Sequence, residues 1–510
     1  MSGPQPIRIG IVGGGTAGYL AALALRIKRP ELAVTMIESS RIPVIGVGEG
    51  TTPIMVPFLH GYLGLDVSEF HTEVQPTWKI GVRLDWGAAD DTHFEFPFDA
   101  HGLTDSFRFT GNINSGSLGA LLMGRRAGLH LQRADWTYQA LVQALPYAYH
   151  LDNRRFVRYL QRKAAEHDVP VIDALIEHVE MEQGGGVGGL VATDGRRFKF
   201  DLYIDCSGFA SILLERVGSK FISYGRNLFT NAALVADAPH TTAIGPFTHA
   251  QTMDAGWCWS LPQTTSDHRG YVFCSDFLEP DAAADEMRAH CPGLGEPRLV
   301  RFRSGRRTHW WKDNVVGLGN AYGFVEPLEA TALHMVVRQI AYVVKELDTR
   351  LVDPALPTAL NETVGTLWDN LSGLLALHYK HNRRRDTSFW RTARAETELG
   401  AIESSVAAVL ARGPASGPSH DPSTGTLLGG LEDEINLLLL GMKVFSPDLI
   451  QATASQEQWN RRLAMLNGWA SRALSVKQSL AMVCRDSAAA DPRGGMWYEG
   501  VLSGLENPIR

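Results

Sequence analysis

The chain has 510 residues, of which 45% are hydrophobic, so it can bury a large core, and its length predicts about two or three structural modules. A formal net charge of −7 and short basic runs leave no basic surface for nucleic acid, which excludes nucleic-acid binding as its function. The five cysteines are scattered and contain no C-x-x-C pair, which predicts a protein of the reducing cytoplasm without a disulfide framework or a zinc site. No apolar run approaches about 18 residues, so we expect a globular protein without a signal peptide or a membrane span.

Residues 8–30 have the pattern of a strand, a tight glycine turn and an apolar helix. Gly13 permits the turn, Gly15 lets a pyrophosphate approach the backbone, and Gly18 lets the helix pack close to the strand. The helix N-terminus then faces the phosphates, so we expect a bound dinucleotide. The predicted contacts in this turn are Gly13, Gly15, Thr16, Ala17 and Gly18.

A second strand, residues 33–37, ends in Glu38, at the distance where a carboxylate accepts hydrogen bonds from a ribose. The same carboxylate would repel a 2′-phosphate, which favours FAD or NAD. A second G-x-G-x-x-G match begins at Gly184, but it lies between two strand-like runs with no helix after it, so we interpret it as a hairpin loop.

Residues 40–53 form a Gly/Thr/Pro-rich loop at the carboxyl edge of the predicted sheet, where Val47 and Glu49 are expected to contact the cofactor. An ordinary crossover loop is the alternative. Residues 77–86 are rich in strand formers and carry Lys79 beside Trp78. A lysine in a strand usually faces solvent, so composition alone would not single it out.

Residues 90–119 are polar and aromatic without helical period, which predicts a long irregular segment, and long loops inside compact proteins tend to be functional. Phe94, Phe96 and Phe98, with His93, could wall an aromatic substrate. A local hydrophobic cluster explains them equally well.

The middle of the chain is predicted as an amphipathic helix at residues 149–167, a strand at 171–181, and a strand at 198–208 that returns to the nucleotide-binding sheet. Residues 209–307 are mostly strands and loops. Within them Trp257 and Trp259 are two positions apart, so they point to the same face of a strand and could form one flat aromatic wall, or belong to the core.

A late strand–glycine–helix junction begins at residue 314 and includes Gly319 as a predicted cofactor contact. Such a junction often completes an FAD site, so it favours FAD over NAD. From residue 328 the pattern is mainly helical, with a flexible interruption at 411–426. We predict one module at 1–345, with insertions at about 77–150 and 209–307, and a helical substrate-side module at 346–510.

Several motifs together resemble the flavin-dependent tryptophan halogenase family across nearly the whole chain. They are GGGTAG at 13–18, IGVGEGTTP at 45–53, the Lys79 strand, IDCSG at 204–208, GWCWSLP at 256–262 and FVEPLEAT at 324–331. The resemblance implies an α/β fold, with a Rossmann-like FAD-binding domain of the flavin monooxygenase type, an inserted β-rich substrate region and a C-terminal helical region.

The resemblance also implies a two-site mechanism. Reduced FAD, supplied by a separate flavin reductase, reacts with oxygen to give a flavin hydroperoxide, and a bound chloride attacks it to form hypochlorous acid. This oxidant travels through an internal passage to Lys79, which receives it or donates a hydrogen bond to it. Glu329 orients the oxidant and takes the proton that the ring loses. Trp257 and Trp259 separate the flavin from the substrate.

Chloride in this family rests on backbone N–H groups that correspond to Thr331 and Ala332. Here Ala330 and Ala332 stand where the usual pattern has Ser and Gly. If the glycine position requires a positive φ, Ala332 is strained.

Members that use free tryptophan enclose it with aromatic residues in the C-terminal helices, but residues 431–447 contain no Tyr or Trp. The apolar run there could be core or the lining of a wider site. We therefore expect an indole carried by something larger, such as a tryptophan residue in a lantibiotic-type peptide of antibiotic biosynthesis.

Three alternatives stay open: a halogenase of free tryptophan, indole or phenol, a flavin-dependent aromatic monooxygenase, and a flavin-binding protein without catalysis. No metal site is expected, because His378 and His381 lack an evident third ligand. The oligomeric state is left open, with a homodimer as one option.

Overall fold

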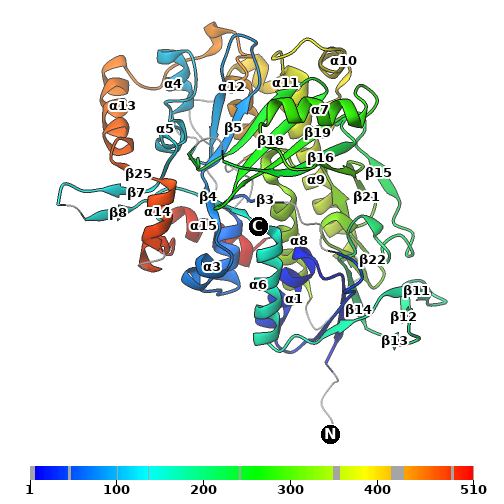
Figure 1. Cartoon of the computed structure of the whole chain (residues 1–510). Helices are drawn as coiled ribbons and strands as arrows, with labels where there is room; N and C mark the ends of the chain where they lie inside the picture. The colour runs from blue at the N-terminus through cyan, green and yellow to red at the C-terminus, as the bar shows by residue number, and fades with distance from the viewer. Residues whose placement is uncertain are drawn as a thin grey trace.

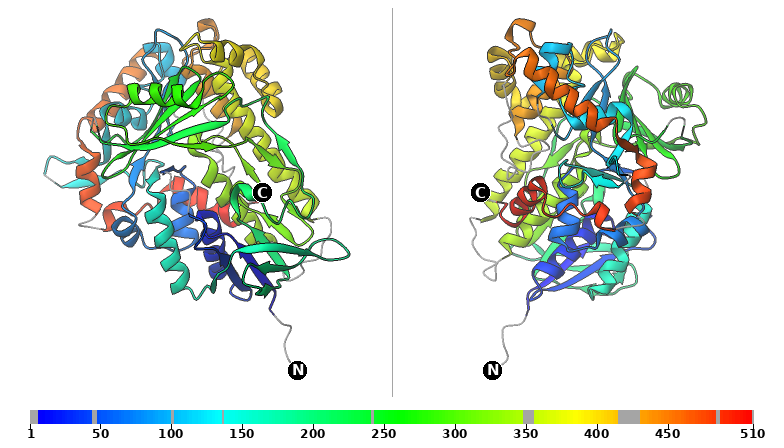
Figure 2. Two further views of the ribbon diagram at one scale, coloured as in Figure 1. Left: turned by 45° about the vertical axis from the view of Figure 1, so that its right-hand side comes forward. Right: turned by 90° about the vertical axis from the view of Figure 1, so that its left-hand side faces the viewer.

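The computed structural model describes residues 6–43, 48–99, 102–135, 137–240, 243–347, 356–414, 430–483 and 487–508. Figure 1 shows two tiers, with the strands nearest the N-terminus and their helices below and a second sheet above. The two further views in Figure 2 show the same arrangement. Val47 and most of the predicted interruption at 411–426 lie outside the described residues.

The lower tier is a six-stranded sheet in the order β10-β2-β1-β14-β23-β22. Its pairs are parallel except for the edge pair β22 and β23, which is antiparallel. This is the predicted nucleotide-binding sheet, including the returning strand. Its strands are β1 (Arg8–Val12), β2 (Ala33–Glu38), β10 (Val171–Asp173), β14 (Leu202–Asp205), β22 (Trp311–Lys312) and β23 (Val315–Gly317).

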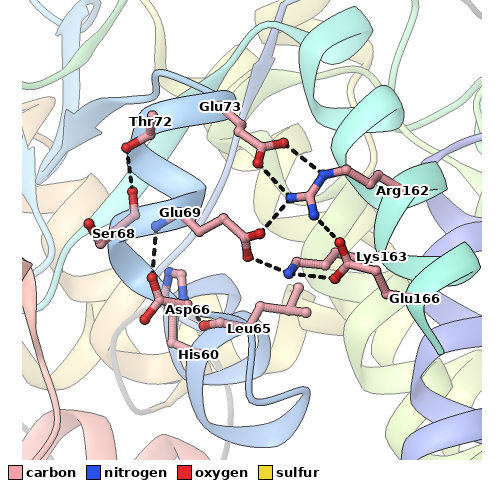
Figure 3. Close-up of polar contacts among 10 residues, drawn as sticks. All are labelled: His60, Leu65, Asp66, Ser68, Glu69, Thr72, Glu73, Arg162, Lys163 and Glu166. Carbon is pink, nitrogen blue, oxygen red and sulfur yellow. Dashed lines mark hydrogen bonds and ion pairs between the residues drawn. The ribbon is translucent and has the colours of Figure 1, made fainter.

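Helix α1 (Thr16–Lys28) packs against α6 (Asn153–Glu166) and α8 (Ala332–Glu346). Helix α6 is also tied to α3 (Val67–Glu73) by ion pairs (Figure 3), in which Arg162 meets Glu69 at 2.7 Å and Glu73 at 2.6 Å. Arg162 is about one third exposed, so each pair contributes little energy, and their effect is to fix the direction of α6.

The upper tier is a seven-stranded sheet in the order β20-β16-β19-β18-β17-β5-β6. It confirms that the 209–307 region consists mostly of strands and loops, and α7 (Pro280–His290) interrupts it. Its strands are β5 (Gly81–Asp85), β6 (Phe94–Pro97), β16 (Ala232–Ala238), β17 (Thr248–Met253), β18 (Gly256–Pro262), β19 (Asp267–Phe273) and β20 (Arg298–Arg301).

The described residues also form four small sheets of three strands, of which the one with β3 and β4 lies between the two tiers (Figure 1). They are β3 (Glu49–Gly50), β9 (Ala148–Leu151) and β4 (Thr77–Lys79); β11 (Ile176–Met181), β12 (Val187–Ala192) and β13 (Arg197–Phe198); β15 (Phe221–Ser223), β21 (Gly305–Arg307) and β24 (Gly323–Phe324); and β25 (Ala473–Ser475), β7 (Ala127–Gln132) and β8 (Tyr138–Ala140). The second glycine motif turns between β11 and β12, so its interpretation as a hairpin is confirmed.

Three predicted elements were wrong in extent. Residues 90–119 hold β6, α4 (Leu103–Thr110) and the start of α5 (Leu118–Arg125) instead of an irregular segment. Helix α4 lies between Gly102 and Gly111, which both have positive φ and end the helix on either side. Because it has only eight residues, its sequence shows no clear helical period. The predicted helix at 149–167 begins as β9, and the predicted strand at 171–181 is split into β10 and β11.

The C-terminal part is mainly helical, as predicted. Its long helix α9 (Leu356–His381) packs against α10, α12 and β22. The other helices of this part are α10 (Ser388–Glu396), α11 (Glu403–Arg412), α12 (Leu431–Gly441), α13 (Gln456–Ala470), α14 (Val476–Val483) and α15 (Met496–Glu506). Short helical turns along the whole chain are α2 (Met55–Pro57), η1 (Phe58–Tyr62), η2 (Gly208–Ala210), η3 (Gly319–Ala321), η4 (Leu328–Ala330), η5 (Gly400–Ile402), η7 (Pro447–Leu449) and η8 (Ser487–Ala490). Within the described ranges, no helix is both long and apolar enough to cross a membrane.

Candidate active site

The glycine turn after β1 has the geometry of a phosphate cradle. A Cβ added to Gly18 would lie 2.0 Å from the Gly13 carbonyl oxygen, and one on Gly13, at φ +124°, would lie 2.2 Å from the Cys206 carbonyl. A Cβ on Gly15 would meet nothing within 4 Å, so open space lies above it. Gly15, the N-cap residue of α1, has no side chain to cap the helix, so the first N–H groups of α1 can bind an anion.

The other predicted cofactor residues of the lower tier surround this turn. Glu38 ends β2 with its carboxylate against Gly14, where an added Cβ would lie 1.8 Å from Oε2. Thr16 donates a hydrogen bond to Asn153 Oδ1 at 3.0 Å. Gly319, at φ +57°, is adjacent to Ala17, because a Cβ added to Gly319 would lie 3.4 Å from the Ala17 methyl. The early and late glycine segments therefore meet.

Glu49, another predicted cofactor residue, begins β3 and pairs with Leu151 of β9. Its Oε2 is buried and lacks a hydrogen-bond partner among the described residues, and burial raises its pKa to about 7. The next residue, Gly50, lies beside Ala330, where the two methyl positions would be 3.1 Å apart. A buried carboxyl oxygen that has no partner among the described residues can form a hydrogen bond to a polar ring system such as that of FAD.

Lys79 is fully buried on β4, unlike the solvent-facing lysine that a strand usually carries. Its Nζ has no hydrogen-bond partner in the described part of the chain, and it lies 5.5 Å from the centre of the Phe98 ring. Burial lowers the pKa of Lys79 to about 8, opposed by the Glu329 carboxylate. The ammonium can therefore give up a proton more readily than an ordinary lysine.

Glu329 is 3% exposed and sits in a strained turn. Glu329 and Ala330 both have positive φ, 67° and 57°. The conditional expectation of strain at Ala332 was wrong, because Ala332 is the first residue of α8 and the left-handed positions come before it. Such strain costs on the order of 1–3 kcal/mol for each residue, which is typical of functional sites.

The two Glu329 oxygens have different surroundings. Oε1 lies 3.0 Å from Nε2 of His378, a buried residue of α9. Oε2 is buried without a hydrogen-bond partner from the described residues. Lys79 Nζ and Glu329 Oε2 are thus a free donor and a free acceptor whose charges interact, which is what a small polar reactant between them would need.

Trp257 and Trp259 lie side by side on β18 with ring centres 5.9 Å apart. The two ring planes are tilted by 51°, so the two side chains are neighbours, as predicted, but they do not form a flat surface. The Trp257 indole N–H donates to Glu326 Oε1 at 3.0 Å, and the Tyr379 hydroxyl donates to the same oxygen at 2.6 Å. Glu326 also accepts from Thr230, and burial raises its pKa.

Sequence reasoning missed Glu326, His378 and Tyr379. Glu326 stands in the quoted FVEPLEAT motif, three residues before Glu329, and this was the available signal. His378 and Tyr379 are consecutive on α9, and each holds one of the two glutamates. Two consecutive residues of α9 therefore hold the carboxyl groups of Glu326 and Glu329 in place.

The three predicted phenylalanines divide between the site and the core. Phe98 lies beside Lys79. Phe94 packs on α12, since a Cβ added to Gly441 would lie 2.3 Å from its ring. Phe96 is fully buried on β6.

Thr331 and Ala332, the predicted halide contacts, form the start of α8. Thr331 is its N-cap residue and makes no side-chain cap, and the buried Thr331 Oγ1 has no hydrogen-bond partner within the described ranges. The first N–H groups of a helix without a side-chain cap can bind an anion.

No group of three or more metal-ligating side chains occurs among the residues that the structure describes. Four described cysteines are free, and Cys484 lies outside the described residues.

A nucleotide cradle, a buried lysine–glutamate pair and a neighbouring tryptophan pair define a flavin-dependent halogenase. Residues 8–423 match the family model described as tryptophan halogenase, so the chain belongs to the tryptophan halogenase family. The predicted family, fold class and enzyme class are thereby confirmed.

Relatives extend this match. The tryptophan 7-halogenase RebH of Lentzea aerocolonigenes is 28% identical over 421 residues, which is 75% of this chain and 78% of RebH. The structure of MibH, a lanthipeptide tryptophan 5-halogenase, is 40% identical with a TM-score of 0.92, and the match covers 99% of each chain. BrvH, a flavin-dependent halogenase from Brevundimonas sp. BAL3, is 28% identical with a TM-score of 0.80, over 94% of this chain and 100% of BrvH.

Proposed function

We propose that this enzyme chlorinates the indole ring of a tryptophan residue carried in a larger substrate, such as a peptide natural product. The observation that carries the reaction is the pair of buried atoms Lys79 Nζ and Glu329 Oε2, which have no hydrogen-bond partner in the described part of the chain. An ammonium donor and a carboxylate acceptor in a water-poor site can hold hypochlorous acid and take up the proton that the ring loses.

FAD bound at the glycine turn, once reduced, supplies the oxygen chemistry that converts chloride into hypochlorous acid. The chain's own contribution is to hold the cofactor through Gly13–Gly18, Glu38, Glu49 and Gly319, and the chloride at the N–H groups of Thr331 and Ala332. Trp257, anchored on Glu326, and Trp259 form the barrier that keeps a large substrate from the cofactor.

Two observations favour a peptide-borne indole. MibH, which is similar to this chain along nearly its full length, is described as acting on a lanthipeptide. In addition, the run Leu437–Leu440 in α12 is buried core and offers no aromatic clamp for a free amino acid. The proposal includes a separate flavin reductase and a cytoplasmic location.

The test supplies the enzyme with FAD, a flavin reductase, NADH, oxygen and either chloride or bromide. Substrates are a tryptophan-containing peptide, the same peptide with phenylalanine, free tryptophan, indole and a phenol. Mass spectrometry should find the halogen isotope pattern only in the tryptophan peptide. Efficient turnover of free tryptophan would contradict the peptide substrate, and an oxygenated product without halide would contradict halogenation itself.

A further inference from the structure

His378 contacts the catalytic glutamate through one ring nitrogen and its own helix through the other. Nδ1 lies 3.0 Å from the Leu374 carbonyl oxygen, one turn earlier in α9. Nε2 lies 3.0 Å from Glu329 Oε1. The side chains of His378 and Glu329 are 0% and 1% exposed, so neither contact is shared with bulk solvent.

The contact of Nδ1 with Leu374 determines the role of Nε2 in its contact with Glu329. A carbonyl oxygen carries no proton, so Nδ1 must be the donor to Leu374. In a neutral imidazole Nε2 is then an acceptor, and an acceptor facing a carboxylate oxygen at 3.0 Å would be repelled. The His378–Glu329 pair must therefore hold one proton between Nε2 and Oε1.

We propose that His378 is the positioning residue that carries this proton on Nε2, so that Glu329 stays a carboxylate whose free Oε2 receives the proton of the indole ring. The inference rests on the proposed function, because it concerns the same halogenation. The other charged or titratable groups near the pair are Lys79, Glu326 and Tyr379.

The step balances without another reactant. The ring carbon forms its bond to chlorine while the chlorine–oxygen bond of hypochlorous acid breaks, and the departing hydroxide takes a proton from the Lys79 ammonium to become water. The ring C–H bond then breaks, its electron pair restores aromaticity, and the proton passes to Glu329 Oε2. Transfer from Glu329 to the Lys79 amine resets the site.

Burial explains why a second group is needed. Beside an Nε2 without a proton, Oε1 would have to carry the proton itself or turn away, and a carboxyl that already holds a proton is only a weak base at Oε2. The imidazolium removes both outcomes, since it occupies Oε1 and compensates the charge. This resembles the way in which a carboxylate orients a catalytic histidine, with the two roles exchanged.

The test compares His378→Gln with His378→Phe and a matched control. Glutamine can still donate to Glu329 but cannot carry the proton, whereas phenylalanine can do neither. We expect FAD binding and KM within about twofold of wild type for His378→Gln, with kcat reduced at least tenfold, and a loss of about 10²–10⁴-fold for His378→Phe, the usual range for proton transfer. The control His381→Gln, three residues further on, should keep wild-type kcat.

A deuterium-labelled indole ring separates proton transfer from a structural defect. Loss of the ring proton should become rate-limiting in His378→Gln and produce a primary isotope effect that wild type lacks. Wild-type kcat in His378→Gln, or a slow variant without an isotope effect, would overturn the proposal.

A second measurement needs no turnover. In the unliganded protein labelled with nitrogen-15 histidine, NMR should find Nε2 of His378 protonated, and Glu329→Gln should shift it to the unprotonated position. An unprotonated Nε2 in wild type would overturn the inference even if halogenation occurs. If wild type halogenates no substrate, the proposed function fails, while the NMR result still locates the proton.

Discussion

Lys79 is a buried cation without a hydrogen-bond partner among the described residues, so the side chain that the proposed chemistry needs should weaken the fold. Its pKa falls from 10.5 to about 8 on burial. Since each pKa unit corresponds to ~1.4 kcal/mol, Lys79→Met should raise the free energy of unfolding at pH 7 by about 3 kcal/mol. Halogenation should be abolished while FAD binding persists, as urea denaturation, product analysis and flavin fluorescence would measure.

The pH dependence of this gain follows from the same pKa. Between pH 8 and 10.5 the unfolded chain binds more protons at Lys79 than the folded chain, so wild-type stability rises with pH in this window. The advantage of Lys79→Met should be complete below pH 8 and lost near pH 10.5. A stability difference that stays constant between pH 7 and 10 would show that burial of the charge is not its cause.

Glu326 is the anchor of the tryptophan pair, and the Tyr379 hydroxyl donates a hydrogen bond to its Oε1 at 2.6 Å. Tyr379→Phe removes a hydrogen bond to a buried carboxyl group, which should cost about 1.5–3 kcal/mol of stability and loosen Trp257. Thermal unfolding would measure the loss of stability, and a change in tryptophan fluorescence that is absent from a Trp257→Phe background would report the loosening of Trp257.

Tyr498→Phe is the matched control for this substitution. The Tyr498 hydroxyl is buried and has no hydrogen-bond partner within the described ranges, so its removal should change stability by no more than ~0.5 kcal/mol. Equal losses from the two variants would mean that the hydroxyl of Tyr379 does not hold Glu326.

At the scale of elements, the turn between β1 and α1 contains two glycines with opposite surroundings. A Cβ at Gly18 would lie 2.0 Å from a backbone oxygen, whereas one at Gly15 would enter open space. Gly18→Ala should therefore destabilise the fold by several kcal/mol. Gly15→Ala should fold normally but bind FAD at least tenfold more weakly, because its methyl occupies the space predicted for the phosphates.

Flavin fluorescence titration and thermal unfolding of the two variants would separate these effects. Normal FAD affinity in a folded Gly15→Ala protein would contradict the predicted position of the pyrophosphate. Normal stability of Gly18→Ala would contradict the close helix–strand contact.

Elements with a clear local pattern were predictable, and those defined by distant contacts were not. The alternating apolar residues of β1 and β2 and the long apolar stretch of α1 identified the nucleotide-binding sheet directly. Helix α4 was missed because eight residues give too little period. Burial of Lys79 on β4 depends on Phe98 and Glu329, which are far from it in sequence, so no local pattern could indicate it.

The resemblance identified Lys79, Glu329 and the tryptophans as site residues but not the groups that hold them. Glu326 follows a strand and resembles an ordinary buried or capping carboxyl in sequence. His378 and Tyr379 occupy one turn of a long helix, where neighbouring apolar residues predict only a core face. Their roles become visible only in the folded chain, where α9 lies beside Glu326 and Glu329.

At the scale of the whole molecule, the predicted boundary near residue 345 divides the sequence but not the site. Helix α9 supplies His378 and Tyr379 to the glutamates of the first module, and its Asp369 pairs with Arg306 of β21 at 2.7 Å. One cluster of buried apolar residues contains both Ile9 and Leu505. The two proposed modules therefore share their core.

A shared core predicts that the chain unfolds as one cooperative unit in urea. Removing α9 would expose apolar surface on the first module, take the Tyr379 hydroxyl from Glu326 and take His378 from Glu329, so neither part should be stable alone. Far-ultraviolet circular dichroism reports mainly the helices, and tryptophan fluorescence includes the buried Trp257 and Trp78 of the sheets. Their transitions should coincide at one midpoint. An earlier loss of helical signal, with the fluorescence of the sheets retained, would contradict this and support separate modules on either side of residue 345.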